Sequence, residues 1–447
     1  MTFQKTVYLV SLGCAKNRVD SEVMLGYLVN DGYEIVSHPQ EATVIIINTC
    51  GFIASAKQES IDTILEMARY KTAGKAKYLI VTGCLSQRYA KELQKEIPEI
   101  DYLLGTGNFI EIAKVLRKDI VRKKISKLPP PVFTLNANTP RLRTLALHYS
   151  YVKVSEGCSN KCAFCAIPFI RGAQCSRTVA DVMREVEQLL ASDCVEINLL
   201  AQNLCAYGHD LTPKQNLVQL LHALDKLGSE REHYWIRCLY LYPRGLTKEL
   251  IDTIASSKHV LKYIDIPLQH IADPILRRMH RGKGGAATWD LIRVLRKAIP
   301  GLVLRTTFIT GLPYETADDF KQLCDFVREI KFEHMGVFTF SPEEGTAAAT
   351  MKGQVPAELA LNRRDKLMSI QQKISKAQQK AMLGKTIEVL VDGISDESDM
   401  LLQGRHQGQA PEVDGVTYIT SGTAKPGDIV NIVVDQVGDY DVAGEIL

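Results

Sequence analysis

Three cysteines lie close together in the segment 158–165, which reads CSNKCAFC. Cys158, Cys162 and Cys165 offer three thiolates on one short loop, and a cluster of four irons needs four ligands, so one iron would stay open to a small molecule. The alternatives are a zinc knuckle and three buried cysteines that cluster by chance. Because zinc needs a fourth ligand nearby and the segment follows an expected strand, the pattern favours an iron–sulfur cluster with an open iron.

Three further cysteines, Cys14, Cys50 and Cys84, recur at intervals of 36 and 34 residues. Each comes shortly after an apolar, strand-like run, and these runs cover residues 7–10, 44–47 and 78–81. A single cysteine of this kind is more often a buried small hydrophobe. Three in register favour a second iron–sulfur cluster, again with one iron that lacks a cysteine. The other cysteines share no spacing and are interpreted as packing residues: Cys175, Cys194, Cys205, Cys238 and Cys324.

The elements that must position the second set of cysteines alternate along residues 1–115. Helical stretches at 20–30 and 56–70 follow strand-like runs, and this order indicates a parallel sheet with right-handed crossovers. The carboxyl ends of parallel strands meet at one edge of a sheet, which is the usual ligand site. We therefore expect an N-terminal parallel α/β domain that gathers Cys14, Cys50 and Cys84 at this edge.

Residues 145–350 carry strand candidates that alternate with helices, which predicts a central partial (β/α) barrel. The candidates are 151–154, 195–200, 235–241, 262–266, 303–309 and 336–340. Barrels of this type place their chemistry at the carboxyl ends of the strands. Polar side chains gather there: Glu156, Gln202, Asn203, Gln269, His270 and Ser341.

Residues 116–144 are expected to be a linker, because they hold a basic run at 117–127 and then several prolines. A phosphate-binding patch is the alternative, but the run has no interleaved aromatic residues. Residues 351–382 show helical spacing after Pro356 and are expected to form a connecting helix. Residues 383–447 alternate strand-like runs with turns, which predicts a small antiparallel β-barrel.

Composition supports metal chemistry over disulfide chemistry. The chain has 447 residues, eleven cysteines and a formal net charge of +3, and no apolar run approaches the roughly 20 residues of a spanning helix. The cytoplasm is the expected compartment. A chain of this size in a reducing compartment does not need a disulfide framework.

The segment SEGCSNKCAFCAIPFIRG from Ser155 resembles the radical S-adenosylmethionine superfamily. Nearly the whole chain resembles its methylthiotransferase branch, and within it the enzymes that modify an aspartate of ribosomal protein S12. The sister enzymes, which modify an adenosine of transfer RNA, share the cysteine plan and are the alternative. The supporting segments are SLGCAKNRVDSE from Ser11, INTCGFIASAKQESIDTILE from Ile47, YIDIPLQHIADPILRRMHRG from Tyr263 and APEVDG from Ala410.

This resemblance implies cofactors, domains and a reaction. The cofactors are two 4Fe-4S clusters and S-adenosylmethionine. The domains are a methylthiotransferase domain (1–115), a radical S-adenosylmethionine barrel (145–350) and a TRAM domain (383–447). A deoxyadenosyl radical, made at the Cys158–Cys162–Cys165 cluster, takes hydrogen from the β-carbon of the aspartate. The other cluster holds or delivers sulfur, and a second S-adenosylmethionine supplies the methyl group. A low-potential electron donor such as flavodoxin is expected, and the sulfur donor is left open.

Contacts to S-adenosylmethionine are expected from barrel residues and from the aromatic residue of the cysteine loop: Phe164, Gln202, Arg237, Gln269 and Arg305. The alternative for the two arginines is that they are paired structural charges, since a charge inside a barrel must be compensated. Two positions depart from the family pattern, because Asn203 stands where an aspartate is common and Tyr314 replaces a glycine. They leave the ligand details open.

The charge of residues 383–447 bears on the substrate. Twelve acidic against three basic side chains give this segment a net charge of −9. Such a module repels RNA phosphates and attracts a basic protein, as ribosomal proteins are. The alternative is that the acids only solvate a small barrel. A different class of function is also open, in which the amino-terminal domain is a scaffold that docks on the ribosome and catalysis is incidental or lost. The intact cysteine loop argues against a scaffold.

Overall fold

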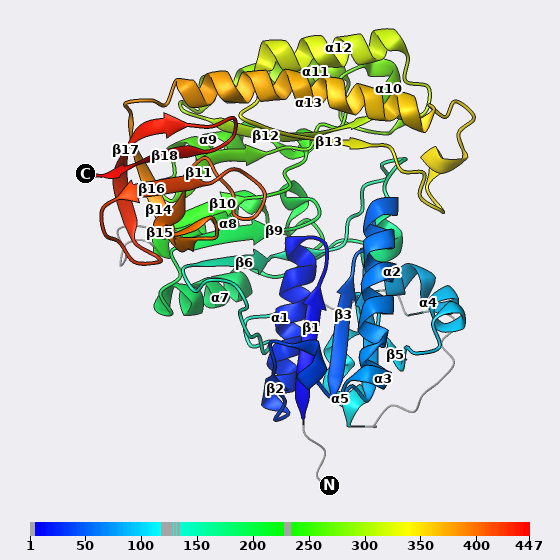
Figure 1. The fold of residues 1–447 in the computed structure, drawn as a ribbon. Coiled ribbons are helices and arrows are strands. Elements are labelled where there is room, and N and C mark those ends of the chain that lie inside the picture. Colours follow the sequence, from blue (N-terminus) through cyan, green and yellow to red (C-terminus); the bar gives the residue numbers. More distant parts are fainter. Residues whose placement is uncertain (1–4, 118–127, 129–130, 132–134, 228–233) are drawn as a thin grey trace.

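The computed structural model describes residues 5–117, 128, 131, 135–227 and 234–447. Figure 1 shows an N-terminal α/β unit, a larger barrel unit beside it, and a small C-terminal barrel at the far end of the larger one. The basic run expected at 117–127 lies outside the described residues except for Arg117, which pairs with Asp31. The expected fold class is confirmed in all three units.

The N-terminal unit is a parallel sheet with strand order β2-β1-β3-β4-β5. Its central strands β3 and β4 are almost wholly apolar and buried, as expected for a sheet covered on both faces. The elements are β1 (Thr6–Ser11), α1 (Ala15–Asn30), β2 (Glu34–Ile35), β3 (Val44–Thr49), α2 (Ala54–Ala68), α3 (Tyr70–Ala73), β4 (Tyr78–Gly83), α4 (Cys84–Glu96), β5 (Tyr102–Leu103) and α5 (Ile112–Leu116).

Helix α1 begins five residues earlier than its hydrophobic pattern predicts, directly after Cys14. Its first turns carry Lys16, Asn17 and Asp20, which are polar in sequence but buried in the structure. They are buried because this face of α1 packs against the barrel unit and meets charged partners there. A pattern based on apolar spacing therefore misses the start of the helix.

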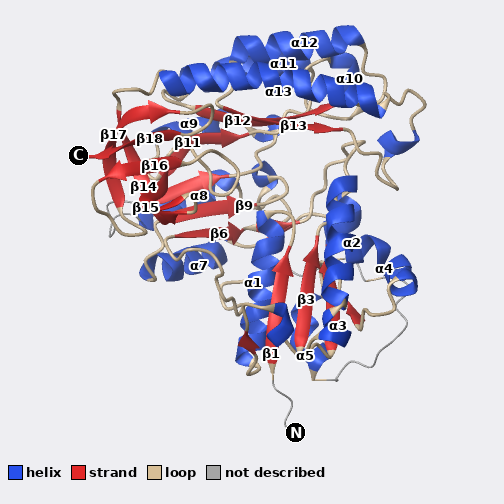
Figure 2. Ribbon diagram, viewed as in Figure 1, coloured by secondary structure: helices blue, strands red, loops and turns tan. Residues whose placement is uncertain are grey.

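The second unit is an open, parallel sheet of order β13-β12-β11-β10-β9-β6, which is the expected partial barrel. Helices cover its outer face, and Figure 2 shows them as a layer around the strands. The elements are β6 (Tyr149–Lys153), β7 (Ser155–Glu156), α6 (Ile167–Arg171), β8 (Cys175–Ser176), α7 (Val179–Ala191), β9 (Glu196–Leu200), α8 (Leu217–Leu227), β10 (Trp235–Cys238), α9 (Lys248–Ser256), β11 (Val260–Asp265), α10 (Asp273–Arg278), α11 (Gly285–Ala298), β12 (Val303–Thr310), α12 (Ala317–Ile330) and β13 (His334–Thr339).

The expected connecting helix is α13 (Ala357–Lys380), and it lies along β13 and α12. It leads into a closed barrel of order β14-β15-β16-β18-β17. One pair, β16 with β18, is parallel, so this barrel is not antiparallel throughout as expected. Its strands are β14 (Thr386–Ser395), β15 (Ser398–His406), β16 (Thr417–Ser421), β17 (Ile429–Val437) and β18 (Val442–Ile446).

The C-terminal barrel closes the end of the larger barrel where the strands begin. Tyr263 donates a hydrogen bond from its hydroxyl to Asp414 at 2.6 Å, and the hydroxyl of Tyr151 donates to the carbonyl of Pro411 at 3.2 Å. The opposite end, where the barrel strands finish, faces the N-terminal unit (Figure 1). Among the described helices, none has the length and apolar character that crossing a membrane requires.

Candidate functional site

The first three cysteines lie at one edge of the N-terminal sheet. Cys14 directly precedes α1, Cys50 directly follows β3, and Cys84 is the first residue of α4 after β4. The strands β1, β3 and β4 are neighbours and run parallel, so their carboxyl ends share this edge. The structure therefore brings the triad Cys14–Cys50–Cys84 to the place that the sequence predicts.

Two glycines allow the three turns to approach one another. A Cβ at Gly13, whose φ is +88°, would lie 2.9 Å from the Cβ of Cys50, and one at Gly51 would lie 2.7 Å from the Cα of Leu85. Both distances are too short for a side chain to fit. The chain can therefore fold around a compact group at this edge only because these positions have no side chain.

Two effects act in opposite directions on thiolates at this edge: helix N-termini favour them, whereas burial and mutual repulsion disfavour them. Cys14 and Cys84 lie at the N-termini of α1 and α4, where neither helix has a side-chain cap and the backbone N–H groups favour negative charge. Burial raises the pKa of Cys50 to about 12, with the neighbouring thiolates of Cys84 and Cys14 adding to it. Burial also raises the pKa of Cys84, while Arg171 opposes the rise. Three mutually repelling thiolates need a cation, and a metal cluster supplies one.

The second triad lies on the loop that follows β7. The backbone N–H of Cys158 donates to Gly172 at 3.0 Å, and that of Cys165 donates to Cys162 at 3.1 Å, so the loop folds back on itself. Arg281 lies over the ring of Tyr242, 4.3 Å from its centroid, and donates to the sulfur of Cys162 at 3.7 Å.

These three thiols also share one environment. Burial raises the pKa of Cys158 and raises that of Cys165 to about 12, and the charge of Cys162 adds to both shifts. Among the described residues, no three His, Cys, Asp or Glu side chains already stand together at distances suited to one metal ion. The donor set fits an iron–sulfur cluster in each triad, and ligation stays a prediction.

A buried ionic network joins the N-terminal unit to the barrel unit. Lys153 on β6 pairs with Asp20 on α1, and also with Glu156 at 2.7 Å. Arg171 at the end of α6 pairs with the same two carboxylates at 2.7 Å and 3.1 Å. All four side chains are at most 5% exposed. Two cations and two carboxylates balance, which is the condition for burying them.

Two expected S-adenosylmethionine contacts, Gln202 and Gln269, lie at the carboxyl end of the barrel. Gln202 follows β9 and donates to Glu156, and Gln269 is bridged through its backbone to β12. The side-chain oxygen of each is buried and has no partner within the described part of the chain. Unpaired buried acceptors are costly, so both oxygens fit a ligand that offers donors, as S-adenosylmethionine does.

The two expected arginine contacts are engaged within the protein, as their alternative anticipated. Arg237 is fully buried, donates to Glu196 at 2.9 Å and to the carbonyl of Gln407 at 2.9 Å. Arg305 lies 3.4 Å from Asp265 and 3.2 Å from Asp414. Both pairings lie towards the C-terminal barrel. The structure therefore favours structural pairing over cofactor contact for Arg237 and Arg305.

The remaining predicted positions have distinct environments. Phe164 packs in a small apolar cluster with α10. Asn203 is buried, and its side-chain oxygen has no partner among the described residues. Tyr314 adopts a φ of +66°, a backbone conformation that glycine adopts more easily than tyrosine, and its ring lies 4.7 Å from the guanidinium of Arg278. His270 is a buried core histidine, and burial lowers its pKa to about 4.

Ser341 belongs to a clasp between the barrel and the N-terminal unit. Its hydroxyl accepts from the backbone N–H of Ala54 at 3.2 Å and donates to Glu343 at 2.7 Å. Glu343 pairs with Arg88 on α4 and with Lys57 on α2. We call the contacts of Arg88, Lys57 and Glu343 the α4 clasp.

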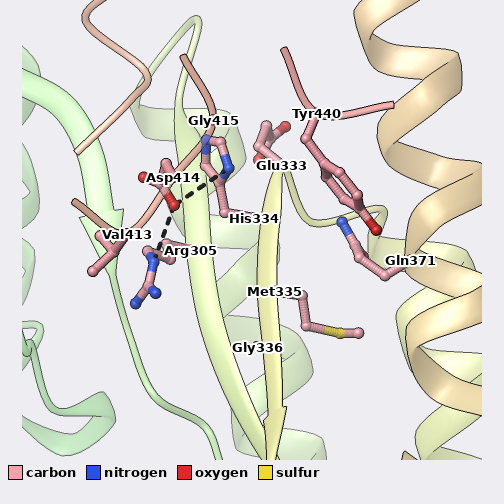
Figure 3. A pocket seen from close by; sticks show the side chains of 10 residues that line it. All are labelled: Arg305, Glu333, His334, Met335, Gly336, Gln371, Val413, Asp414, Gly415 and Tyr440. Atoms are coloured by element: carbon pink, nitrogen blue, oxygen red, sulfur yellow. Dashed lines mark hydrogen bonds and ion pairs between the residues drawn. The ribbon is translucent and has the colours of Figure 1, made fainter. Parts of the chain in front are cut away.

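A cavity of about 340 Å³ lies at the junction of β12, β13, α13 and the C-terminal barrel. Figure 3 shows His334 and Arg305 both directed at Asp414 beside it. Arg305 and His334 stand near the beginnings of β12 and β13, whereas both cysteine triads lie at strand carboxyl ends. The cavity is therefore separate from the cysteine site.

Sequence reasoning missed several residues that link the N-terminal unit to the barrel unit: Asn17, Asp20, Lys153, Arg171 and Tyr240. One signal was available, because a lysine in the middle of a predicted barrel strand must find a buried partner. Lys16 on α1 is another buried lysine that the sequence did not single out. Its ammonium lies 3.2 Å from the ring centroid of Tyr240, and burial lowers its pKa.

Three family descriptions match the chain in the order of its units. Residues 6–105 match Uncharacterized protein family UPF0004, residues 152–327 match the Radical SAM superfamily, and residues 383–447 match the TRAM domain. Among solved structures, the radical S-adenosylmethionine methyltransferase TsrM from Kitasatospora setae has a TM-score of 0.57 at 15% identity, over 77% of this chain and 75% of that chain. The cobalamin-dependent enzyme OxsB has a TM-score of 0.52 at 13% identity, over 83% of this chain and 56% of that chain. These likenesses concern the fold.

Curated relatives are similar over almost the whole length. A protein of Anaeromyxobacter sp. (strain Fw109-5), named Ribosomal protein uS12 methylthiotransferase RimO, is 49% identical over 99% of this chain and 93% of its own length. A protein of the same name from Myxococcus xanthus (strain DK1622) is 47% identical over 100% of this chain and 92% of its own.

Proposed function

Because the chain belongs to the RimO family of ribosomal protein uS12 methylthiotransferases, we propose that it inserts a methylthio group at the β-carbon of an aspartate of uS12. It is a radical S-adenosylmethionine enzyme. The observation that carries the proposal is the presence of two cysteine triads, one in each of the two units that the buried network of Lys153, Asp20, Glu156 and Arg171 joins.

In this proposal the two triads have different tasks. Cys158, Cys162 and Cys165 would hold a cluster whose chemistry is the reductive cleavage of S-adenosylmethionine, whereas Cys14, Cys50 and Cys84 would hold a cluster whose chemistry is the supply of sulfur. Gln202 and Gln269 orient S-adenosylmethionine through their unpaired side-chain oxygens. Phe164, which packs in the apolar cluster with α10, would contact S-adenosylmethionine beside the cysteine loop.

The partners follow from charge and chemistry. Exposed acids on the C-terminal barrel, among them Asp396, Glu397 and Asp435, suit a basic ribosomal protein and repel RNA phosphates. The enzyme works in the cytoplasm, where ribosomes are, and takes electrons from a low-potential donor such as flavodoxin.

The test restores a gene-deletion strain with four forms of the chain: wild type, Cys158→Ala, Cys50→Ala and Cys324→Ala. The mass of uS12 and the nucleosides of transfer RNA are measured from each strain. We expect a methylthio increment on uS12 with wild type and with Cys324→Ala, because Cys324 is a packing residue on α12. Cys158→Ala and Cys50→Ala should abolish it.

Two outcomes would contradict the proposal. If the mass of uS12 never changes and methylthioadenosine depends on the chain, the substrate is transfer RNA. If Cys158→Ala or Cys50→Ala retains the increment on uS12, the role assigned to that triad is wrong.

A further inference from the structure

Arg171 lies on the helix that follows the second triad, and its side chain contacts residues beside the first triad. It ends α6, which begins two residues after Cys165, and its side chain is 2% exposed. One terminal nitrogen, Nη1, donates to Asp20 at 2.7 Å and to Glu156 at 3.1 Å. The other, Nη2, donates to Asn17 and to the sulfur of Cys84 at 3.6 Å. Arg171, on the helix that follows the loop of Cys158, Cys162 and Cys165, thus contacts Cys84, a predicted ligand in the N-terminal unit.

The position of Arg171 is fixed by charge. If its guanidinium moved away, Asp20 and Glu156 would share Lys153 as their one cation among the described residues, although Glu156 would still accept from Gln202. An unpaired buried carboxylate is strongly disfavoured, so the guanidinium is held in place. Holding the guanidinium also holds its N–H group against the sulfur of Cys84.

The α4 clasp provides a comparison within the same interface. Arg88 also joins the two units, but its contacts are the carbonyls of Gly51 and Glu344 and the carboxylate of Glu343. These partners are oxygen atoms. Arg88 and Arg171 therefore both join the two units, but of these two arginines Arg171 alone donates a hydrogen bond to a cysteine sulfur.

We propose that Arg171 is a positioning residue that holds Cys84 against the helix following the second triad. Through its N–H donation to the sulfur of Cys84, it also raises the reduction potential of the cluster held by the first triad. A donor and a positive charge at a ligand sulfur stabilise the reduced, more negative cluster. This inference rests on the proposed function, because it takes Cys84 as a ligand.

The experiment uses the full chain with one triad removed. In the first background Cys158, Cys162 and Cys165 are alanines, and in the second Cys14, Cys50 and Cys84 are. Each background carries Arg171→Met together with Asp20→Asn, which removes one charge of each sign and keeps the network balanced. After reconstitution with iron and sulfide, potentiometric titration followed by electron paramagnetic resonance measures the midpoint potential.

We expect the midpoint potential to become more negative in the first background and to stay unchanged in the second. Arg171→Lys, which keeps the charge but loses the two-armed contact, should give a smaller shift in the same direction. Arg88→Met with Glu343→Gln, which breaks the α4 clasp, should leave the potential of the first triad unchanged.

The possible outcomes distinguish a failure of the role of Arg171 from a failure of the proposed function. If no iron–sulfur cluster assembles in the first background with Arg171 intact, the ligand assignment of the first triad fails, and the inference with it. If the cluster assembles and neither Arg171 variant moves its potential, only the role of Arg171 is refuted. If Arg88→Met with Glu343→Gln shifts the midpoint potential equally, the effect of Arg171 comes from looser packing of the two units and not from its contact with the sulfur.

Discussion

The carboxyl of Glu156 is ionised against the effect of its own burial. Burial favours the neutral acid, but the nearby charges of Arg171 and Lys153 outweigh it and lower the pKa to about 2, from an ordinary value of 4.5. The ionised carboxylate of Glu156 is therefore more stable in the folded protein than in the unfolded chain. The resulting stability is fully present above about pH 4.5 and is lost as the pH falls through about 2.

We predict that Glu156→Gln lowers the free energy of unfolding by about 3 kcal/mol at neutral pH, because it leaves two buried cations with one carboxylate. The difference from wild type should narrow as the pH falls below 4.5. Urea unfolding of the metal-free protein at several pH values measures it. Glu445→Gln, at an exposed position, is the control. A difference that stays constant down to pH 3 would contradict the assigned pKa.

At the scale of elements, the helices begin in two different ways. Three barrel helices begin with a threonine whose hydroxyl accepts from a backbone N–H, namely α7 at Thr178, α9 at Thr247 and α12 at Thr316. Helices α1 and α4, which begin at the first triad, lack such a cap. Helices α2, α10, α11 and α13 lack a side-chain cap as well, so an uncapped start is not special to the first triad. At α1 and α4, however, the N-terminal N–H groups lie beside Cys14 and Cys84 and favour negative charge there.

For α12 we predict that Thr316→Ala lowers the free energy of unfolding by about 1 kcal/mol. The hydroxyl of Thr316 accepts from the backbone of Asp319 at 3.1 Å, and the carboxylate of Asp319 accepts from the backbone of Thr316 at 3.0 Å. Thermal or urea unfolding measures the loss. Thr316→Ser keeps the hydroxyl and should retain most of the stability, and equal losses in both variants would exclude the cap as the cause.

At the scale of the whole molecule, the C-terminal barrel is docked by buried charge. Glu196 on β9 is fully buried and accepts from Arg237 at 2.9 Å and from Arg405 on β15. Arg405 also pairs with Asp392 at 2.8 Å, and its guanidinium lies 4.9 Å from the ring centroid of Tyr149. Part of the acidity that residues 383–447 show in sequence thus serves contacts inside the molecule.

We predict that Glu196→Gln weakens this docking by about 3 kcal/mol, because buried Arg237 would lose its carboxylate partner and Arg405 would keep only Asp392. Hydrogen exchange of β14 and β15 and limited proteolysis near the exposed Leu383 should both accelerate. Asp435→Asn, at an exposed position of β17, should change stability by no more than about 0.5 kcal/mol. Unchanged protection of β14 and β15 in Glu196→Gln would show that apolar contacts alone hold the barrel in place.

The sequence by itself determined the cysteine positions and the architecture that presents them. Three cysteines on one loop, and one cysteine after each of three strands, are local or periodic features. Their meeting at one edge follows from the rule that parallel strands end together. The alternation of elements likewise determined the order of an α/β unit, a partial barrel and a small barrel, down to the helix that begins after Pro356.

Only the tertiary structure decided how the buried charges are paired. Asp20 lies 133 residues from Lys153 and 151 from Arg171 in sequence, and no periodicity links positions so far apart. The same holds for Arg237 and Arg305, whose place in barrel strands suggested a cofactor and whose partners are Glu196, Asp265 and Asp414. A buried charge must be compensated, but which group compensates it depends on how the separate units pack together.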